Sequence, residues 1–217
     1  MMKILESNPS RYDRGISFLT LGKLDKVYDR LISHINRGER VLDIGCGTGL
    51  LTLKAAFKGA LVKGIDVNSQ MLEIAQKRVV EANLINTVEL SEMGIAELDY
   101  EKSNFYDAVL SGLCFSELTE NELLYTLKEV KRILKLGGRL LVADEVRPKS
   151  IFKRLLKGLI RFPLVIITYL ITQTTTHAVK DLPDKIQSIG MKLEFVKLNN
   201  WENFIELTAQ KTKEREK

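Results

Sequence analysis

A run of glycines directly after an apolar segment constrains this chain more than any other feature. Residues 41–51 read VLDIGCGTGLL, which begins like the end of a buried strand. Glycines at Gly45, Gly47 and Gly49 permit positive φ and leave space for a ligand against the backbone. The pattern predicts a strand, a tight turn and a helix that Thr48 caps.

The spacing of the glycines and the carboxylate beside them limit the ligand. A dinucleotide fingerprint reads G-x-G-x-x-G and places a pyrophosphate on the helix N-terminus. Here the run reads D-x-G-x-G-x-G, and the charge of Asp43 would repel a pyrophosphate. The sequence therefore favours a ligand with a positive group and no phosphate at this place. S-adenosylmethionine, with its sulfonium and ammonium groups, is such a ligand.

The glycine run resembles the first motif of the class I S-adenosylmethionine-dependent methyltransferases. A second acidic position supports the resemblance, because the short strand VKGID ends in Asp66, 23 residues after Asp43. That separation is about the length of one strand-helix-strand unit. The resemblance implies that Asp66 accepts hydrogen bonds from the ribose hydroxyls. Asn68 or Ser69 is expected to cap the helix that follows.

The resemblance also implies which residues surround the cofactor and its product, S-adenosylhomocysteine. Relatives carry Gly-Asp-Ala after the third strand, where this chain has Met93, Gly94 and Ile95. We expect Met93 and Ile95 to sandwich the adenine, with Glu92 or backbone atoms at its edge. The predicted cofactor-binding residues are Asp43, Gly45, Cys46, Gly47, Gly49, Asp66, Val67, Met71, Met93, Gly94, Ile95, Ser111 and Tyr12.

Alternating strand-like and helix-like segments predict one α/β domain over residues 1–217. We expect a doubly wound, Rossmann-like, seven-stranded and mostly parallel sheet, with a helical insert after the fifth strand and an antiparallel C-terminal strand pair. The predicted parts are a helical lead-in (1–37), a cofactor-binding core (38–146), a basic apolar insert or lid (147–180) and a C-terminal helix and hairpin (181–211). The predicted strands after the first two are 87–90, 106–112, 139–146, 192–198 and 203–209, with helices over 120–134 and 181–189 and a turn at 137–138.

Composition excludes several classes of protein. The two cysteines make no disulfide framework, and the N-terminus has no apolar core of signal-peptide length, so a reducing cytoplasm is expected. Two histidines far apart and no paired cysteines predict no metal site. The net charge of +5 comes from one segment of the chain, because seven basic and no acidic residues lie between Glu145 and Asp181. A nucleic-acid partner is therefore not expected.

The basic insert is the most unusual segment. Residues 151–160 place apolar residues on one side of a helix and basic residues on the other, and apolar character continues past Pro163 to Thr172. No unbroken run reaches the roughly 20 apolar residues that cross a bilayer. The segment 149–172 is a lid over an apolar acceptor, a helix on the anionic inner membrane surface, or a docking face for an acidic protein.

Three side chains are candidates for a general base on the acceptor side. His177 follows three threonines, Glu117 lies after the fourth strand, and Glu145 ends the fifth strand beside Asp144. Asp144 and Glu145 are expected to orient the acceptor. Cys114 has no basic partner in the sequence and is expected to be an apolar packing thiol rather than a nucleophile.

The finer resemblance concerns the acceptor. Residues 11–22, RYDRGISFLTLG, resemble a segment of quinone-biosynthesis methyltransferases, and the whole chain is more similar to corrinoid protein-associated methyltransferases. That similarity implies a corrinoid or a corrinoid protein as acceptor, where reduced cobalt is the nucleophile and no protein base is needed. Two alternatives stay open. One is a quinone-like or lipid-like small molecule at the membrane, and the other is a non-catalytic cofactor-binding partner that docks on a corrinoid protein through residues 149–161.

Overall fold

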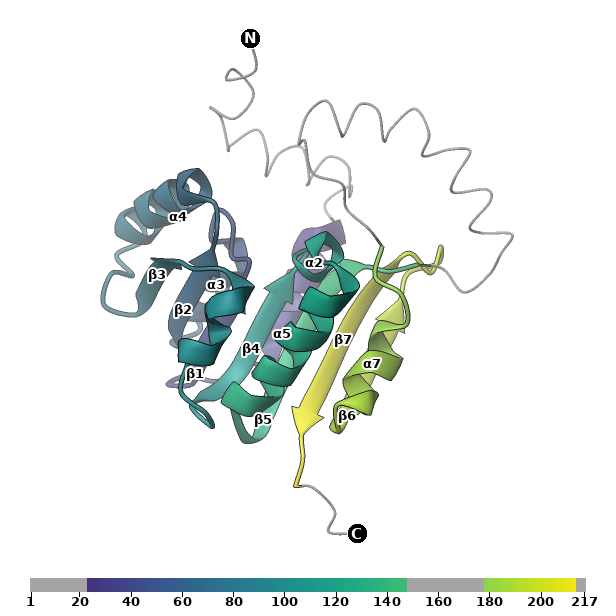
Figure 1. The fold of residues 1–217 in the computed structure, drawn as a ribbon. Coiled ribbons are helices and arrows are strands. Elements are labelled where there is room, and N and C mark those ends of the chain that lie inside the picture. Colours follow the sequence, from purple (N-terminus) through teal and green to yellow (C-terminus); the bar gives the residue numbers. More distant parts are fainter. Residues whose placement is uncertain (1–22, 148–177, 214–217) are drawn as a thin grey trace.

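The computed structural model describes residues 23–147 and 178–213. At its centre lies a seven-stranded sheet with the order β3-β2-β1-β4-β5-β7-β6 (Figure 1). The first five strands in the chain are mutually parallel, and β7 is antiparallel to both of its neighbours. The predicted α/β fold class is confirmed. The predicted helical insert lies outside the described residues.

Strands and helices alternate along the chain, as a doubly wound fold requires. The strands are β1 (Arg40–Ile44), β2 (Leu61–Asp66), β3 (Val88–Glu92), β4 (Tyr106–Gly112), β5 (Leu134–Glu145), β6 (Met191–Leu198) and β7 (Phe204–Lys211). The helices are α2 (Lys23–Ser33), α3 (Leu50–Phe57), α4 (Ser69–Glu81), α5 (Glu120–Ile133) and α7 (Leu182–Ser188), with short 3₁₀ helices η1 (Ile95–Tyr100) and η2 (Phe115–Glu117).

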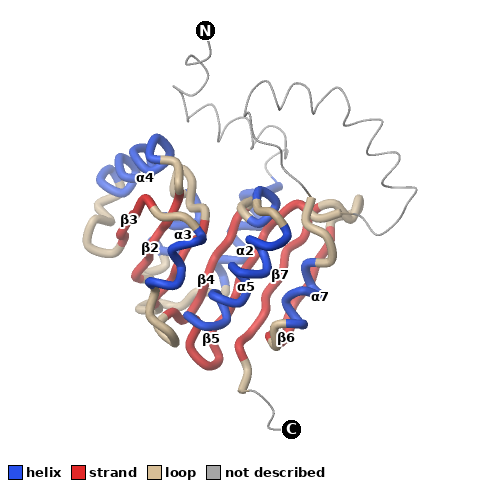
Figure 2. The backbone as a smooth tube through the Cα atoms, viewed as in Figure 1, coloured by secondary structure: helices blue, strands red, loops and turns tan. Residues whose placement is uncertain are grey.

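Helices cover both faces of the sheet, as Figure 2 shows, and each face has its own apolar cluster. Neighbouring residues of one strand point to opposite faces. In β1, Val41 therefore packs with α2 and α3, whereas Leu42 belongs to the cluster that includes side chains of η1, α5 and α7. Near-continuous burial of β1, β4 and β5 follows from this two-sided cover.

The glycine pair before the fifth strand differs from the prediction. We expected a turn at residues 137–138 and a strand from Arg139, but β5 already begins at Leu134. Tyr106 pairs with Leu134 and Ala108 with Arg139, so four residues of β5 stand opposite one residue of β4. Gly137 has a φ of 81°, which permits this irregularity inside a continuous strand.

The chain leaves β5 and returns to it at one place. Val146 forms a parallel bridge with Val179. The N–H of Arg147 donates to the Val179 carbonyl at 2.9 Å, and the N–H of Val179 donates to the Glu145 carbonyl at 3.0 Å. Arg147 and Val179, near the two ends of the predicted insert 147–180, therefore both lie at the carboxyl end of β5.

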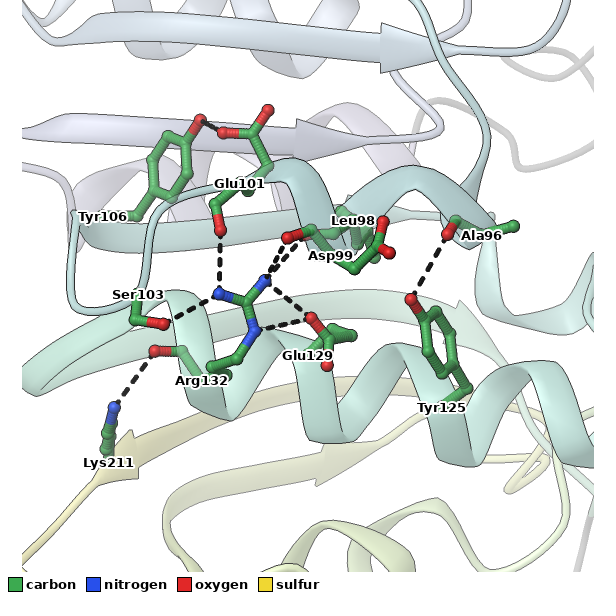
Figure 3. A network of polar contacts seen from close by, with 10 residues as sticks. All are labelled: Ala96, Leu98, Asp99, Glu101, Ser103, Tyr106, Tyr125, Glu129, Arg132 and Lys211. Atoms are coloured by element: carbon green, nitrogen blue, oxygen red, sulfur yellow. Dashed lines mark hydrogen bonds and ion pairs between the residues drawn. The ribbon is translucent and has the colours of Figure 1, made fainter.

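A single arginine fastens α5 to η1 (Figure 3). The Nη2 of Arg132 donates to the Leu98 carbonyl at 2.8 Å, and its Nη1 donates to the Glu101 carbonyl, also at 2.8 Å. Its Nε donates to the Glu129 carboxylate at 2.7 Å. On the same helix, the Tyr125 hydroxyl donates to the Ala96 carbonyl at 3.3 Å. Helix α5 thus fixes the segment that directly follows the third strand.

We predict that Arg132→Leu lowers the free energy of unfolding by roughly 2 to 4 kcal/mol, because several carbonyls and a carboxylate lose a charged donor. Urea denaturation followed by circular dichroism measures the change. Lys192→Ala is the control, since Lys192 is an exposed member of a surface ion pair with Glu194 and should contribute less than about 0.5 kcal/mol. Equal effects of the two substitutions would contradict the role of Arg132.

Candidate functional site

The glycine turn joins β1 to α3 at the carboxyl edge of the sheet, where open α/β sheets bind their ligands. Its three glycines all have positive φ: 67° at Gly45, 52° at Gly47 and 82° at Gly49. The N–H of Cys46 donates to the Ile65 carbonyl at 2.9 Å, which ties the turn to β2. The N-cap residue of α3 is Gly49, which has no side chain to cap the helix, so the predicted cap by Thr48 is wrong.

The three glycines serve different purposes. A Cβ at Gly45 would lie 2.6 Å from the Cβ of Cys114, and one at Gly49 would lie 3.1 Å from the Cβ of Ala75. At these two positions glycine permits close packing. A Cβ at Gly47 would meet no atom of the described residues within 4 Å, so among these residues the backbone there borders open space. Gly47 is therefore the member of the turn that has room for a ligand.

Asp66 connects the turn to the next helix. Its Oδ2 accepts a hydrogen bond of 2.8 Å from the Gly47 N–H, and its Oδ1 accepts one of 2.8 Å from the Asn68 N–H. A carboxylate has about four acceptor positions. Because Asp66 is only partly buried, it keeps capacity for two further donors. Asn68 caps α4 by accepting from the N–H groups of Gln70 and Met71, as predicted.

Asp43 is a buried carboxylate beneath the turn, with 1% of its surface exposed. Its Oδ2 accepts from the Thr52 hydroxyl at 2.6 Å. Its Oδ1 has no hydrogen-bond partner among the described residues. Burial raises the pKa of Asp43 to about 7, and the nearby charge of Asp66 adds to the effect, whereas Thr52 opposes it. A buried carboxylate oxygen without a hydrogen-bond partner can accept a hydrogen bond from a cationic group.

On the far side of the turn, apolar surface comes from Val67, which directly follows β2, and from η1. Val67 is 72% exposed, and a Cβ at Gly94 would lie 3.3 Å from its Cγ1. Ile95 is partly buried nearby, and Met71 is partly buried at the start of α4. Met93 is only 9% exposed and belongs to the core cluster, so it does not offer the apolar surface expected of it. Val67 offers such surface instead.

The loop after β4 forms the opposite side of the site. Ser111 is fully buried inside the sheet, and its hydroxyl has no partner among the described residues. Cys114 packs on Gly45, and burial keeps the pKa of its thiol well above the usual range. This placement agrees with the predicted packing thiol. Glu117 is exposed, and its pKa is raised by partial desolvation and by repulsion from Asp66.

Asp144 has a different role from the one expected. It is fully buried, its Oδ2 accepts from the Phe115 N–H at 2.7 Å, and its Oδ1 accepts from the Glu145 N–H at 2.6 Å. Burial raises its pKa to about 7, although the hydrogen bonds oppose the shift. The expectation that Asp144 orients an acceptor is wrong, because its carboxylate faces the backbone of the loop. Glu145 is partly buried at the same edge.

Comparisons with known proteins agree with this architecture. Residues 41–138 match a family model described as a methyltransferase domain. A solved structure of geranyl diphosphate C-methyltransferase from Streptomyces coelicolor A3(2), in complex with S-adenosyl-L-homocysteine, is similar with a TM-score of 0.66 at 13% identity, covering 87% of this chain and 78% of that one. The chain has the class I methyltransferase fold.

Two curated relatives are also methyltransferases. A demethylmenaquinone methyltransferase from Symbiobacterium thermophilum is 28% identical over 157 residues, which cover 70% of this chain and 61% of that protein. A phosphatidylethanolamine N-methyltransferase from Cereibacter sphaeroides is 34% identical over 135 residues, which cover 61% of this chain and 64% of that protein. The chain thus spans less than two thirds of the length of either relative.

Two predicted site residues and one predicted contact segment lie outside the described residues. They are Tyr12, His177 and the basic segment 149–172. Within residues 23–147 and 178–213, no helix is long and apolar enough to cross a membrane.

The two buried carboxylates predict how stability depends on pH. Burial raises the pKa of both Asp43 and Asp144 to about 7 in the folded protein, from an ordinary value of 3.8. The folded state therefore binds more protons than the unfolded state between these values, and the free energy of unfolding falls as pH rises from about 5 to 7. We expect a loss of roughly 2 to 4 kcal/mol for each group.

Asp43→Asn should remove the contribution of Asp43 to this pH dependence. The slope of the free energy of unfolding against pH, measured by urea denaturation between pH 5 and 8, should therefore be halved. The slope is compared rather than the absolute stability, because the amide itself adds a buried donor. Glu194→Gln, at an exposed carboxylate on the edge strand β6, is the control and should leave the slope unchanged. If the free energy of unfolding of the wild-type protein did not change between pH 5 and 8, neither carboxylate would have the environment described above.

Proposed function

We propose that this protein is an S-adenosylmethionine-dependent methyltransferase that releases S-adenosylhomocysteine. The observation that carries the proposal is the position of Asp66, which holds the N–H of Gly47 while keeping acceptor capacity at the carboxyl edge of the sheet. The matched methyltransferase domain over residues 41–138 includes both residues. Fold alone does not define an activity, so the proposal rests on this arrangement.

The described residues fit each part of the cofactor. Asp66 has acceptor capacity for the two ribose hydroxyls, and no atom of the described residues occupies the space beside the Gly47 backbone. The buried Oδ1 of Asp43, which has no partner in the described part of the chain, suits a cationic group. Val67 and Ile95 present apolar surface to a flat base. We include Gly45, Cys46, Gly49, Met71, Gly94 and Ser111 in the proposed site as turn and wall residues.

The chain's own contribution to the chemistry is positional. S-adenosylmethionine supplies a methyl group on an electrophilic sulfonium, and transfer needs the acceptor in line at about 3 to 3.5 Å. In the described residues the glycine turn and the loop after β4 form the two sides between which acceptor and sulfonium would meet. Among the described residues of that loop, Glu117 is the candidate general base, because its pKa is raised.

For the acceptor we propose a quinone-like or lipid-like small molecule. Two relatives are named for demethylmenaquinone and phosphatidylethanolamine, which are a quinone and a phospholipid. The sequence of segment 149–172 is also basic and apolar, which suits peripheral contact with an anionic inner membrane surface. The cytoplasmic location is part of this proposal.

A corrinoid or corrinoid protein is the second candidate acceptor, and it is favoured by the resemblance of the whole sequence to corrinoid protein-associated methyltransferases. A strongly nucleophilic metal needs no protein base. Such an acceptor would suit this site, because Asp66 and Asp144 accept hydrogen bonds from backbone N–H groups and Glu117 is repelled by the charge of Asp66. A non-catalytic partner of a corrinoid protein is the remaining alternative.

We predict that Asp66→Ala weakens S-adenosylhomocysteine binding by roughly 1 to 3 kcal/mol, because charge-assisted hydrogen bonds are lost. Isothermal titration calorimetry measures the affinity. Glu194→Gln, near the opposite edge of the sheet, is the control and should bind as the wild-type protein does. If wild type and Asp66→Ala bind equally well, Asp66 does not contact the ribose.

Methyl transfer from radiolabelled S-adenosylmethionine distinguishes the acceptors. The wild-type protein is incubated with a reduced demethylquinone, with phosphatidylethanolamine, or with reduced cobalamin, each with and without vesicles of anionic lipid. We expect label in the quinol or the lipid and an increase when vesicles are present, because membrane binding concentrates both partners. If only cobalamin gained the label, the corrinoid would replace the quinone-like or lipid-like molecule as the proposed acceptor. No transfer to any acceptor, despite cofactor binding, would favour the non-catalytic partner.

A further inference from the structure

The loop between β4 and α5, residues 113–119, adopts a backbone conformation that needs support. Leu113 has a φ of 61°, a left-handed conformation that is unfavourable for leucine because its Cβ crowds the backbone. Its N–H donates to the Ala143 carbonyl at 2.8 Å. The loop then turns back over the end of β5, where buried backbone donors must find acceptors.

Asp144 supplies those acceptors. Its Oδ2 accepts from the N–H groups of both Phe115 and Ser116, at 2.7 and 3.3 Å. Its Oδ1 accepts from the Glu145 N–H at 2.6 Å. Because Asp144 is fully buried, one carboxylate connects the loop to the carboxyl end of β5.

The other side of the loop rests on the glycine turn. Both the Cβ and the Sγ of Cys114 lie 2.6 Å from the position that a Cβ of Gly45 would occupy, so no space remains between the two segments. Three residues further along, Glu117 lies close enough to Asp66 for their charges to repel. The loop is thus enclosed between the proposed cofactor turn and β5.

We propose that Asp144 is a positioning residue, which holds the loop that carries Cys114 and Glu117 against the glycine turn and so couples the acceptor side of the site to the cofactor side. The inference rests on the proposed function for the identity of the two sides. Displacing the loop would move Glu117 and free the surface of Gly45 together, because Phe115 and Ser116 lie between Cys114 and Glu117 in one short 3₁₀ segment.

The two cysteines report on the loop directly. Cys114 is partly exposed and lies on the loop, whereas Cys46 is buried with its Sγ 3.0 Å from the position of a Cβ at Gly64. Alkylation by iodoacetamide, read by mass spectrometry at each cysteine, therefore separates opening of the loop from opening of the whole sheet. A merely destabilised protein would label both cysteines faster.

Asp144→Ala should increase the alkylation rate of Cys114 by about 10-fold or more under conditions in which the protein is folded, with less than about 3-fold change at Cys46. The amides of Phe115 and Ser116 should lose protection from hydrogen exchange in the same variant. Asp144→Asn, which keeps one carbonyl oxygen, should show a smaller increase and tests the proposal if Asp144→Ala does not fold. Wild-type rates at Cys114 in a folded Asp144 variant would overturn the proposal.

Glu206→Gln is the matched control. Glu206 is another buried carboxylate, stands opposite Ala143 on the neighbouring strand, and is bound by Arg30 of α2 through two nitrogen atoms. Its loss should lower stability while changing Cys114 alkylation by less than about 3-fold. An increase equal to that of Asp144→Ala would mean that the loop responds to stability alone, which would contradict a positioning role.

S-adenosylhomocysteine tests the coupling itself. Saturating ligand should slow alkylation of Cys114 by about 3-fold or more in the wild-type protein and have less effect in Asp144→Ala. Bound ligand without protection of wild-type Cys114 would contradict the coupling. If calorimetry shows that the wild-type protein does not bind the ligand, the proposed function fails, whereas the rates without ligand still decide whether Asp144 holds the loop.

Discussion

The hydrogen bond from the N–H of Gly47 to the carboxylate of Asp66 is the interaction on which the geometry of the site depends. It joins the turn after β1 to the end of β2, and the second oxygen of Asp66 holds the N–H of Asn68 at the start of α4. The Asp66 side chain therefore fixes the turn before α3 and the turn before α4 relative to each other. Since parallel strands end at the same edge, these turns lie next to the loop after β4, and a ligand at this edge meets all three.

Two buried carboxylates flank this arrangement and differ in what they contact. Asp43 bonds to a hydroxyl of α3 and keeps one oxygen without a partner in the described chain, so it has capacity for a cation. Asp144 uses both of its oxygens on backbone N–H groups, so it has a structural task. Burial raises the pKa of both to about 7. Their similar titration thus conceals different roles, and the hydrogen-bond partners distinguish them.

The class I methyltransferase fold is compatible with many acceptors, and the described residues explain why. The glycine turn and Asp66 form the proposed cofactor side, and both lie within the matched domain over residues 41–138. On the proposed acceptor side the structure describes the loop of residues 113–119, which is bound to the end of β5. Loops of this kind carry specificity because they vary without disturbing the sheet.

The sequence by itself determined the fold class, the glycine turn, the strand that ends in Asp66 and the closing hairpin. These features depend on local patterns: apolar periodicity, glycine spacing and turn residues, each of which acts within a few neighbours along the chain. Asn68 as the cap of α4 belongs to the same group.

Only the tertiary structure decided which residues of these segments face the site. It turned Met93 into the core and left Val67 exposed, placed Cys114 on Gly45 and directed Asp144 to the loop backbone. It also extended β5 through the glycine pair, because pairing with β4 resumes at Arg139. Such outcomes depend on contacts between residues far apart in the chain, which are 29 residues apart for Phe115 and Asp144, and no local pattern encodes them.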